Sequence, residues 1–325
     1  MNFTVAERFT APKSNTVPNE DGIVTTKDFA AVIDGSTSKT NFRLLKGERN
    51  GHLCMRLIKE YIHTLAPTAT LQDFCNGVTL YIASCYTPEL RKRLFAHPED
   101  RLTASCVVYS HHRGEIWMVG DCQCQVDGQL YDNPKPYEAT LSAKRARICN
   151  SLLSEGKMTT DQLRINDKGR QAIMQDLISC IQGQNKEYAV IDGFPIPLNL
   201  VRVVTIPQYA HTLILASDGY PLLRPTLEES EQALALQRHN DPLNIKTFRA
   251  TKAFMAGNNS FDDRSYLRLC MSSRHSMYMY MQRTGKYKNR DKHSNWCLSL
   301  LKFEPLVGFE PTTPRLQITC SGQLS

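Results

Sequence analysis

The sequence predicts an α+β protein, organised as a layered sandwich of two mainly antiparallel sheets flanked by helices. Three observations support this fold class. Strand-like and helix-like segments come in blocks rather than in the regular alternation of a parallel α/β fold. The pair Asp127-Gly128 lies between two short β-rich runs and is a strong hairpin signal. The helical segments have apolar faces, which need a sheet to cover.

The elements follow from local patterns along the chain. Runs of apolar and β-branched residues bounded by turn residues predict strands. These strand-like regions are 3–10, 22–34, 102–132, 188–197, 199–209, 211–223 and 262–271. Apolar residues near helical spacing predict helices, with Thr70 as a candidate N-cap of one of them. These helical regions are 52–65, 71–95, 138–185 and 226–240.

Composition indicates a globular protein with a substantial apolar core. The chain has 325 residues, of which 41% are hydrophobic, but no apolar run approaches the roughly 18 residues of a membrane span. The start of the sequence lacks the layout of a signal peptide, so we expect a cytoplasmic protein that does not enter a membrane. The 11 cysteines are scattered and odd in number, which favours reduced thiols over a disulfide framework.

The charge distribution argues against nucleic-acid binding. The net charge is +7, but residues 276–325 hold 7 of the 39 basic and 3 of the 32 acidic residues. Residues 1–275 therefore keep 32 basic against 29 acidic residues, a net charge of only +3. A phosphate-binding surface usually needs a stronger and more clustered charge.

The last part of the chain differs from the rest. Residues 276–325 show no sustained period of either kind, and the final eighteen resemble a transfer-RNA gene translated on its antisense strand. This suggests that translation ran past the natural end of the gene. We expect one domain over residues 1–275, with the helical region 138–185 inside it, and a non-native or disordered extension over 276–325.

The main chemical feature is a set of apolar strands that end on carboxylates. The strand-end carboxylates are Asp34, Asp121, Asp192, Asp218 and the pair Asp262-Asp263. Each one alone is more often a turn or cap residue than a ligand. Several together could converge on one site for a hard cation, and oxygen ligands suit Mg²⁺ or Mn²⁺. Two such ions can activate a bridging water for displacement at phosphorus.

The order of these motifs resembles the metal-dependent PPM-type (2C-type) serine/threonine protein phosphatases, as a divergent bacterial-type member. The resemblance extends over about residues 1–270. The matching stretches are "NED" (19–21), "AVIDGSTSKT" (31–40), "RLTASCVVYS" (101–110), "EIWMVGDCQCQVDGQLY" (115–131), "LILASDGYPLL" (213–223) and "FDDRSYLRL" (261–269).

The resemblance implies an αββα sandwich that hydrolyses phosphoserine and phosphothreonine on a phosphorylated protein substrate. It implies two or three Mg²⁺ or Mn²⁺ ions and a metal-bridging water, without a covalent phosphoenzyme. Asp34 and Asp218 would act in catalysis through that water. The implied metal ligands are Asp21, Asp34, the Gly35 carbonyl, Asp218 and Asp262, with Glu20 acting through a water and Asp121 at a third, weaker metal. We expect a monomer, with the helical region 138–185 as the variable flap of the family.

The sequence departs from the family next to these ligands. Ser36 and Thr37 follow the Asp-Gly pair, so the family's candidate general-acid His is absent. The phosphate-binding Arg expected before Asn19 is also absent, and Lys13 is the only cation there. Lys39 or Arg43 would be the substitute phosphate contact, with a solvated loop charge as the alternative for both.

Two other functions remain compatible with the sequence. The first is a phosphatase-fold regulatory or binding module that has lost activity, which the missing Arg favours. The second is a sugar kinase of the actin-like superfamily, because "IDGSTSKT" resembles the first phosphate loop of those enzymes. The kinase family is much longer, and no second phosphate loop with paired glycines is evident.

Overall fold

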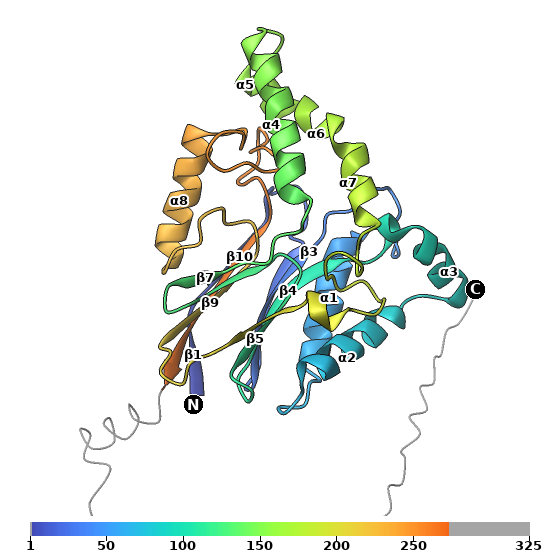
Figure 1. Cartoon of the computed structure of the whole chain (residues 1–325), viewed down its shortest axis with the longest axis vertical. Helices are drawn as coiled ribbons and strands as arrows, with labels where there is room; N and C mark the ends of the chain where they lie inside the picture. The colour runs from blue at the N-terminus through green and yellow to red at the C-terminus, as the bar shows by residue number, and fades with distance from the viewer. Residues whose placement is uncertain (1, 273–325) are drawn as a thin grey trace, which may run out of the picture. The chain divides into compact units, whose positions relative to one another are not determined.

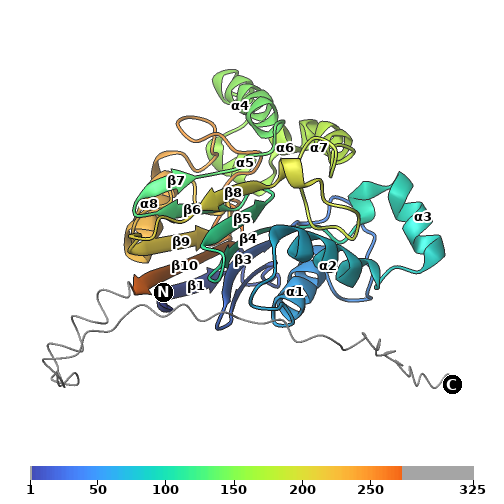
Figure 2. The ribbon, with the colours of Figure 1, turned by 60° about the horizontal axis from the view of Figure 1, so that its bottom comes forward.

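The computed structural model describes residues 2–272 and confirms the predicted fold class. The extension expected over 276–325 lies outside the described residues. Two five-stranded sheets form the centre, and every strand pair within them is antiparallel. Helices flank the two sheets, as Figures 1 and 2 show.

The first sheet joins the two ends of the domain. Its strands, in spatial order, are β1 (Asn2–Ala11), β10 (Arg264–Ser272), β9 (Thr212–Ala216), β6 (Gln123–Val126) and β7 (Gln129–Tyr131). The predicted hairpin connects β6 to β7. Its turn residues Asp127 and Gly128 have φ values of 46° and 85°, a left-handed conformation that Asp tolerates and Gly adopts freely.

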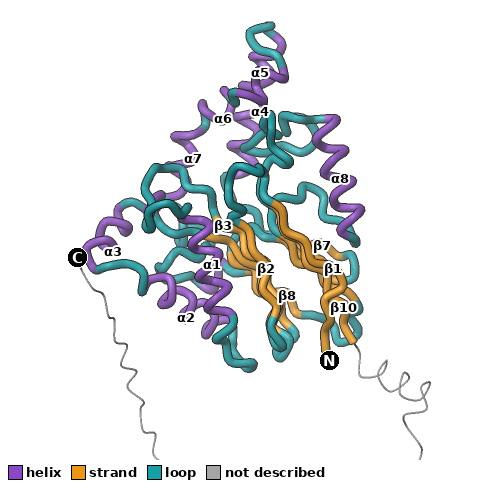
Figure 3. The backbone as a smooth tube through the Cα atoms, turned by 180° about the vertical axis from the view of Figure 1, so that it is seen from behind, coloured by secondary structure: helices purple, strands orange, loops and turns teal. Residues whose placement is uncertain are grey.

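The second sheet contains four strands that follow one another in the chain and a fifth that comes much later. Its strands, in spatial order, are β2 (Asp21–Thr25), β3 (Phe29–Gly35), β4 (Ala104–Ser110), β5 (Glu115–Val119) and β8 (Arg202–Thr205). The sheets are seen from behind in Figure 3.

The helices lie outside the two sheets. They are α1 (Asn50–Ile62), α2 (Leu71–Ala83), α3 (Pro88–Ala96), α4 (Glu138–Ser154), α5 (Thr160–Ile165), α6 (Lys168–Ala172), α7 (Met174–Ile181) and α8 (Leu227–Asn240), with short 3₁₀ turns at Pro98–Asp100 and Leu198–Leu200. Thr70 caps α2 in a capping box with Asp73, as its sequence predicts. Helices α4 to α7 lie beyond one end of the strands (Figure 1).

Alternating side chains place each sheet between two apolar layers. In β3, Ala31 and Ile33 pack with α1 and α2, whereas Ala30 and Val32 face the core between the sheets. A separate cluster that includes Tyr266 and Leu227 packs α8 against the first sheet. This order of layers is the αββα sandwich, and a period of two along each strand produces it.

One predicted strand is not a strand. Residues 188–197 form only isolated bridges, at Tyr188 with Gln184 and at Ile191 with Ala104. The segment is apolar because it is buried against α2 and α3, and its Asp192 forms an ion pair with Arg101 at 2.8 Å. Buried loops and strands share an apolar composition, so the sequence pattern could not separate them. No helix in the described part of the chain is long and apolar enough to cross a membrane.

Candidate metal centre

Asp21 and Asp34 lie side by side because of the register of one hairpin. Asp21 is the first residue of β2, and Asp34 is the last but one of β3. The antiparallel register makes them direct cross-strand partners. Partners in such a pair have Cβ atoms about 4.5–5.5 Å apart, so two carboxylates begin the site from one hairpin.

Gly35 lets the chain pack closely beneath these carboxylates. Its amide donates to the Glu20 carbonyl at 3.0 Å. A Cβ atom at Gly35 would lie 2.3 Å from the Gly51 carbonyl oxygen and 2.6 Å from that of Glu20. The start of α1 therefore contacts the end of β3, and only glycine fits between them.

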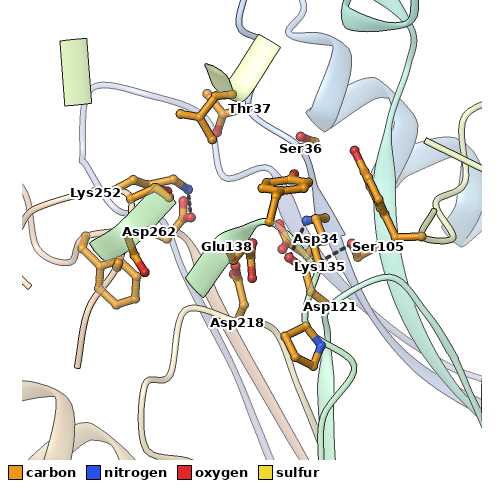
Figure 4. A pocket seen from close by; sticks show the side chains of 18 of the residues that line it. Asp34, Ser36, Thr37, Ser105, Asp121, Lys135, Glu138, Asp218, Lys252 and Asp262 are labelled. Carbon is orange, nitrogen blue, oxygen red and sulfur yellow. Dashed lines mark hydrogen bonds and ion pairs between the residues drawn. The ribbon is translucent and has the colours of Figure 1, made fainter. Parts of the chain in front are cut away.

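Asp218 and Asp262 reach the same place from the first sheet. Asp218 follows β9, and Asp262 precedes β10, the neighbour of β9. Ser217 and Ser265 tie the two segments together, since the Ser265 amide donates to the Ser217 hydroxyl at 2.9 Å. The site thus spans both sheets at one end of the sandwich. In Figure 4 the side chains of Asp34, Asp121, Asp218 and Asp262 line one pocket.

The central carboxylates lack partners in this structure. Among the described residues, neither oxygen of Asp21 accepts a hydrogen bond, and one oxygen each of Asp218 and Glu20 accepts none. Asp21 is 4% exposed and Glu20 is fully buried. Buried carboxylate oxygens are normally paired or bound to a metal, so these oxygens are suited to binding a cation.

Electrostatics identify the same set of side chains. Burial and the nearby Asp263 and Asp218 carboxylates raise the pKa of Asp21 to about 7. Burial, Asp21 and Asp121 raise the pKa of Asp34 to about 8.

The pKa of Asp218 is also raised well above its ordinary value, by burial and by the charges of Asp34 and Asp121. Each shift has neighbouring carboxylates among its causes, so these side chains are close enough to repel one another.

Asp121 differs from Asp21 in having good partners. The Ser105 hydroxyl donates to it at 2.5 Å, and the Lys135 ammonium forms an ion pair with it. Burial acts to raise the pKa of Asp121, but Lys135 and Ser105 outweigh it and the net shift is downward. Asp121 therefore stays ionised without a metal.

Three lysines at the centre were not predicted as site residues. Lys13 lies 3.1 Å from Asp262, 3.4 Å from Asp263 and 3.7 Å from Glu20. Lys252 forms a second ion pair with Asp262, and Lys135 pairs with Asp121. These lysines lie in loops between the regular elements, where the spacing of residues in the sequence does not predict where a side chain will lie. The sequence offered one indication for Lys13, because it lies in the stretch where the phosphatase family has a phosphate-binding Arg.

Glu138 is a further carboxylate that sequence reasoning missed. It begins α4 and lines the pocket beside Lys135. Burial and the Asp121 carboxylate raise its pKa to about 7. An acidic residue in the first turn is common in helices, so the sequence offered no reason to select it.

The carboxylates of this site are chemically suited to a divalent metal, but their side chains are not arranged around a single ion in this structure. Within residues 2–272, no group of three or more Asp, Glu, His or Cys side chains is arranged to hold a metal ion. The lysine ammonium groups instead pair with Asp121 and Asp262. Oxygen donors from Asp21, Asp34 and Asp218 would suit Mg²⁺ or Mn²⁺ once these side chains converge.

Residues after Gly35 form a polar wall of the pocket. The Thr37 hydroxyl donates to Glu20 at 2.7 Å and accepts from Lys13 at 2.9 Å. Lys39, the predicted phosphate contact, lines the pocket and donates to the Thr37 carbonyl. Arg43, its alternative, donates to backbone carbonyls of Thr40 and Phe42 instead.

No family model and no curated protein matches the sequence. Bacterial phosphatases are among the solved structures that match the chain. The catalytic domain of the serine/threonine protein phosphatase PstP, in complex with two manganese ions, is 11% identical with a TM-score of 0.43, and the match covers 83% of this chain and 98% of that one. Serine/threonine phosphatase Stp1 from Staphylococcus aureus is 14% identical with a TM-score of 0.43, over 83% and 96% of the two chains.

PppA, a regulatory component of T6SS in Pseudomonas aeruginosa, is 11% identical with a TM-score of 0.43, over 83% and 98% of the chains. These TM-scores lie below 0.5, so the function proposed below depends on the carboxylates of this chain.

Proposed function

We propose that the chain is a PPM-type phosphoprotein phosphatase that hydrolyses phosphoserine and phosphothreonine with two or three Mg²⁺ or Mn²⁺ ions. The observation that supports this most is the position of Asp21, Asp34 and Asp218 at one end of both sheets, where buried oxygens of Asp21 and Asp218 have no partner among the described residues. Mutual repulsion of buried carboxylates is relieved by a divalent cation, which is the usual reason for such a cluster.

The predicted site residues would bind the metals either directly or in a weaker, less direct way. Asp21, Asp34, the Gly35 carbonyl, Asp218 and Asp262 would be the metal ligands, with Glu20 contacting a metal through water and Asp121 at a third, weaker ion. Bound divalent ions supply an activated water and neutralise charge on the phosphate. Asp34 and Asp218 would act in catalysis by holding the ions that activate that water.

The pocket supplies contacts for the phosphate. Lys39 lines it, and the hydroxyl groups of Ser36 and Thr37 lie on the same wall. A lysine ammonium binds phosphate as a point charge and lacks the bidentate fork of arginine, so we expect a weaker grip than in a site with arginine. A monomer in the cytoplasm stays our prediction for the assembly and location.

The first experiment measures Mn²⁺-dependent release of phosphate from a phosphoserine peptide and from p-nitrophenyl phosphate. Asp34→Asn and Asp218→Asn remove one metal-ligating charge each with little change in volume. We expect both variants to lose about 100-fold or more in kcat, because a misplaced metal water loses most of its activation. Asp161→Asn is the matched control, since this side chain is 86% exposed on α5 and lies outside the pocket.

Each outcome selects one function. Equal rates in the wild type and both Asp variants would contradict a two-metal phosphatase. Metal binding without hydrolysis of either substrate would support the regulatory module instead. Metal-dependent transfer of phosphate from ATP to a sugar would support the kinase.

A further inference from the structure

A cavity of about 350 Å³ extends from the carboxylates to the helical region. Asp34, Asp218 and Asp262 line its floor, and Arg170 of α6 with Leu177 of α7 lines the far side. The cavity therefore has more volume than one phosphate group needs. Its far wall comes from the region 138–185, which contributes no predicted metal ligand.

Five cations from four separate segments line this cavity. They are Lys39 after β3, Lys135 before α4, Arg170 on α6, and Arg249 and Lys252 before β10. Burial and, after it, the charges of Lys252, Arg170 and Lys135 together lower the pKa of Lys39 to about 7. Like charges from distant parts of the chain are thus held close together around one space.

These cations differ in what they contact. Lys135 and Lys252 form ion pairs with Asp121 and Asp262 on the floor. Within residues 2–272, the Lys39 ammonium donates only to the Thr37 carbonyl, and the Arg170 guanidinium donates only to Thr251, at 2.8 Å to its carbonyl oxygen. The charges of Glu20 and Asp167 act on these two cations, but no carboxylate in the described chain forms an ion pair with either side chain.

Two cations without a counter-ion in a partly buried space make a site for an anion. Their attraction for an acidic group is strengthened by the low local dielectric, and the Thr251 contact holds the Arg170 guanidinium in place. The metals would bind the scissile phosphate at the floor. Lys39, the phosphate contact proposed above, has three N–H donors, so it can also contact a second acidic group on the same substrate, together with Arg170.

We propose that the preferred substrates are phosphopeptides in which a second acidic group, a carboxylate or another phosphate, lies next to the scissile phosphate. This inference rests on the phosphatase function proposed above and specifies its substrate class. The scissile phosphate lies over Asp34 and Asp218, and the second acidic group contacts Lys39 and Arg170.

The test compares three phosphoserine peptides that differ only in the residue after phosphoserine, which is Glu, Gln or Lys. For the wild-type protein with Mn²⁺ we expect kcat/KM to be about five- to tenfold higher for the Glu peptide than for the Gln peptide, and lowest for the Lys peptide. Lys39→Gln and Arg170→Gln should each bring the Glu-to-Gln ratio close to one. Arg147→Gln, an exposed arginine on α4 outside the cavity, should keep the wild-type ratio.

A binding measurement keeps the test independent of catalysis. Fluorescence anisotropy of labelled Glu and Gln phosphopeptides is measured with wild type, Lys39→Gln and Arg170→Gln, and we expect the same preference and the same loss. Equal affinities and equal kcat/KM values for the Glu and Gln peptides would overturn the inference. So would an unchanged ratio in both cavity variants, or hydrolysis of p-nitrophenyl phosphate but of no peptide.

The two proposals fail differently. If no substrate is hydrolysed but the Glu peptide still binds more tightly through Arg170, the phosphatase function is contradicted and the acidic-group site is retained. If all peptides are hydrolysed equally, the phosphatase function is retained and the substrate preference is wrong.

Discussion

Arg145 joins the helical region to the rest of the domain, and its removal has a cost that can be worked out from its contacts. The side chain is fully buried. Its Nε and Nη2 donate to Asp167 at 3.0 and 2.7 Å, and its Nη1 donates to the carbonyls of Leu243 and Ala250 at 2.8 and 3.0 Å. One guanidinium thus connects α4, the start of α6 and the loop that leads to Lys252.

Arg145→Met removes all of these contacts together. Asp167, which is 6% exposed, then keeps a buried charge without its cation. Removing one partner of a buried ion pair costs about 3–5 kcal/mol, so we expect the free energy of unfolding to fall by about 4 kcal/mol. Adding Asp167→Asn removes the stranded charge while keeping an N-cap for α6, and should recover about 1–2 kcal/mol.

Urea unfolding followed by circular dichroism measures these changes, and hydrogen exchange of peptides from 138–181 locates them. Arg147→Met is the matched control because this arginine is exposed on the same helix, and it should change stability by less than about 0.5 kcal/mol. An Arg145→Met protein as stable as this control, with unchanged exchange in α4 to α6, would refute the role assigned to the buried pair.

Three further predictions concern the carboxylate end. Gly35→Ala should cost about 1–3 kcal/mol and weaken Mn²⁺ binding, because its Cβ would lie 2.3 Å from a backbone oxygen; a melting temperature and Mn²⁺ affinity equal to wild type would contradict the close packing. Lys252→Met should tighten Mn²⁺ binding about three- to tenfold in calorimetry, because it frees Asp262 from a competing ammonium; weaker binding would show that Lys252 supports the site. The pKa values of Asp21 and Asp34 are raised to about 7 and about 8 from an ordinary 3.8, so the folded metal-free protein holds protons that the unfolded chain has lost. Its melting temperature should therefore fall as pH rises from about 4 to about 8, and saturating Mn²⁺ should remove that fall; a melting temperature that rises over this range without metal would contradict the shifts.

The sandwich could be predicted because its strands and helices come in blocks and its hairpin turn is distinctive. Asp127-Gly128 marked the β6–β7 turn, and the continuous apolar run that ends at Asp34 predicted the strand β3. The same rule failed at 188–197, where burial against helices gave a loop the composition of a strand. Apolar content reports burial, and the backbone conformation depends on what surrounds the segment.

The candidate site was predictable only where strands position it. Asp21 and Asp34 stand at strand ends, so the register of one hairpin brings them together. Lys135, Lys252 and Arg170 lie on loops and a short helix, whose paths depend on tertiary contacts such as the buried Arg145 pair. Sequence spacing carries no information on such contacts, and the cationic lining of the pocket became visible only in three dimensions.

The number of Mn²⁺ ions bound at equilibrium tests the central claim most directly. Calorimetric titration of the full chain, checked by metal analysis after gel filtration, should give at least two Mn²⁺ per wild-type chain. Asp34→Asn and Asp218→Asn should each lose at least one, while Asp161→Asn keeps the wild-type number. No Mn²⁺ bound by the wild type, or the same number bound by all four proteins, would contradict a metal centre built on Asp21, Asp34 and Asp218.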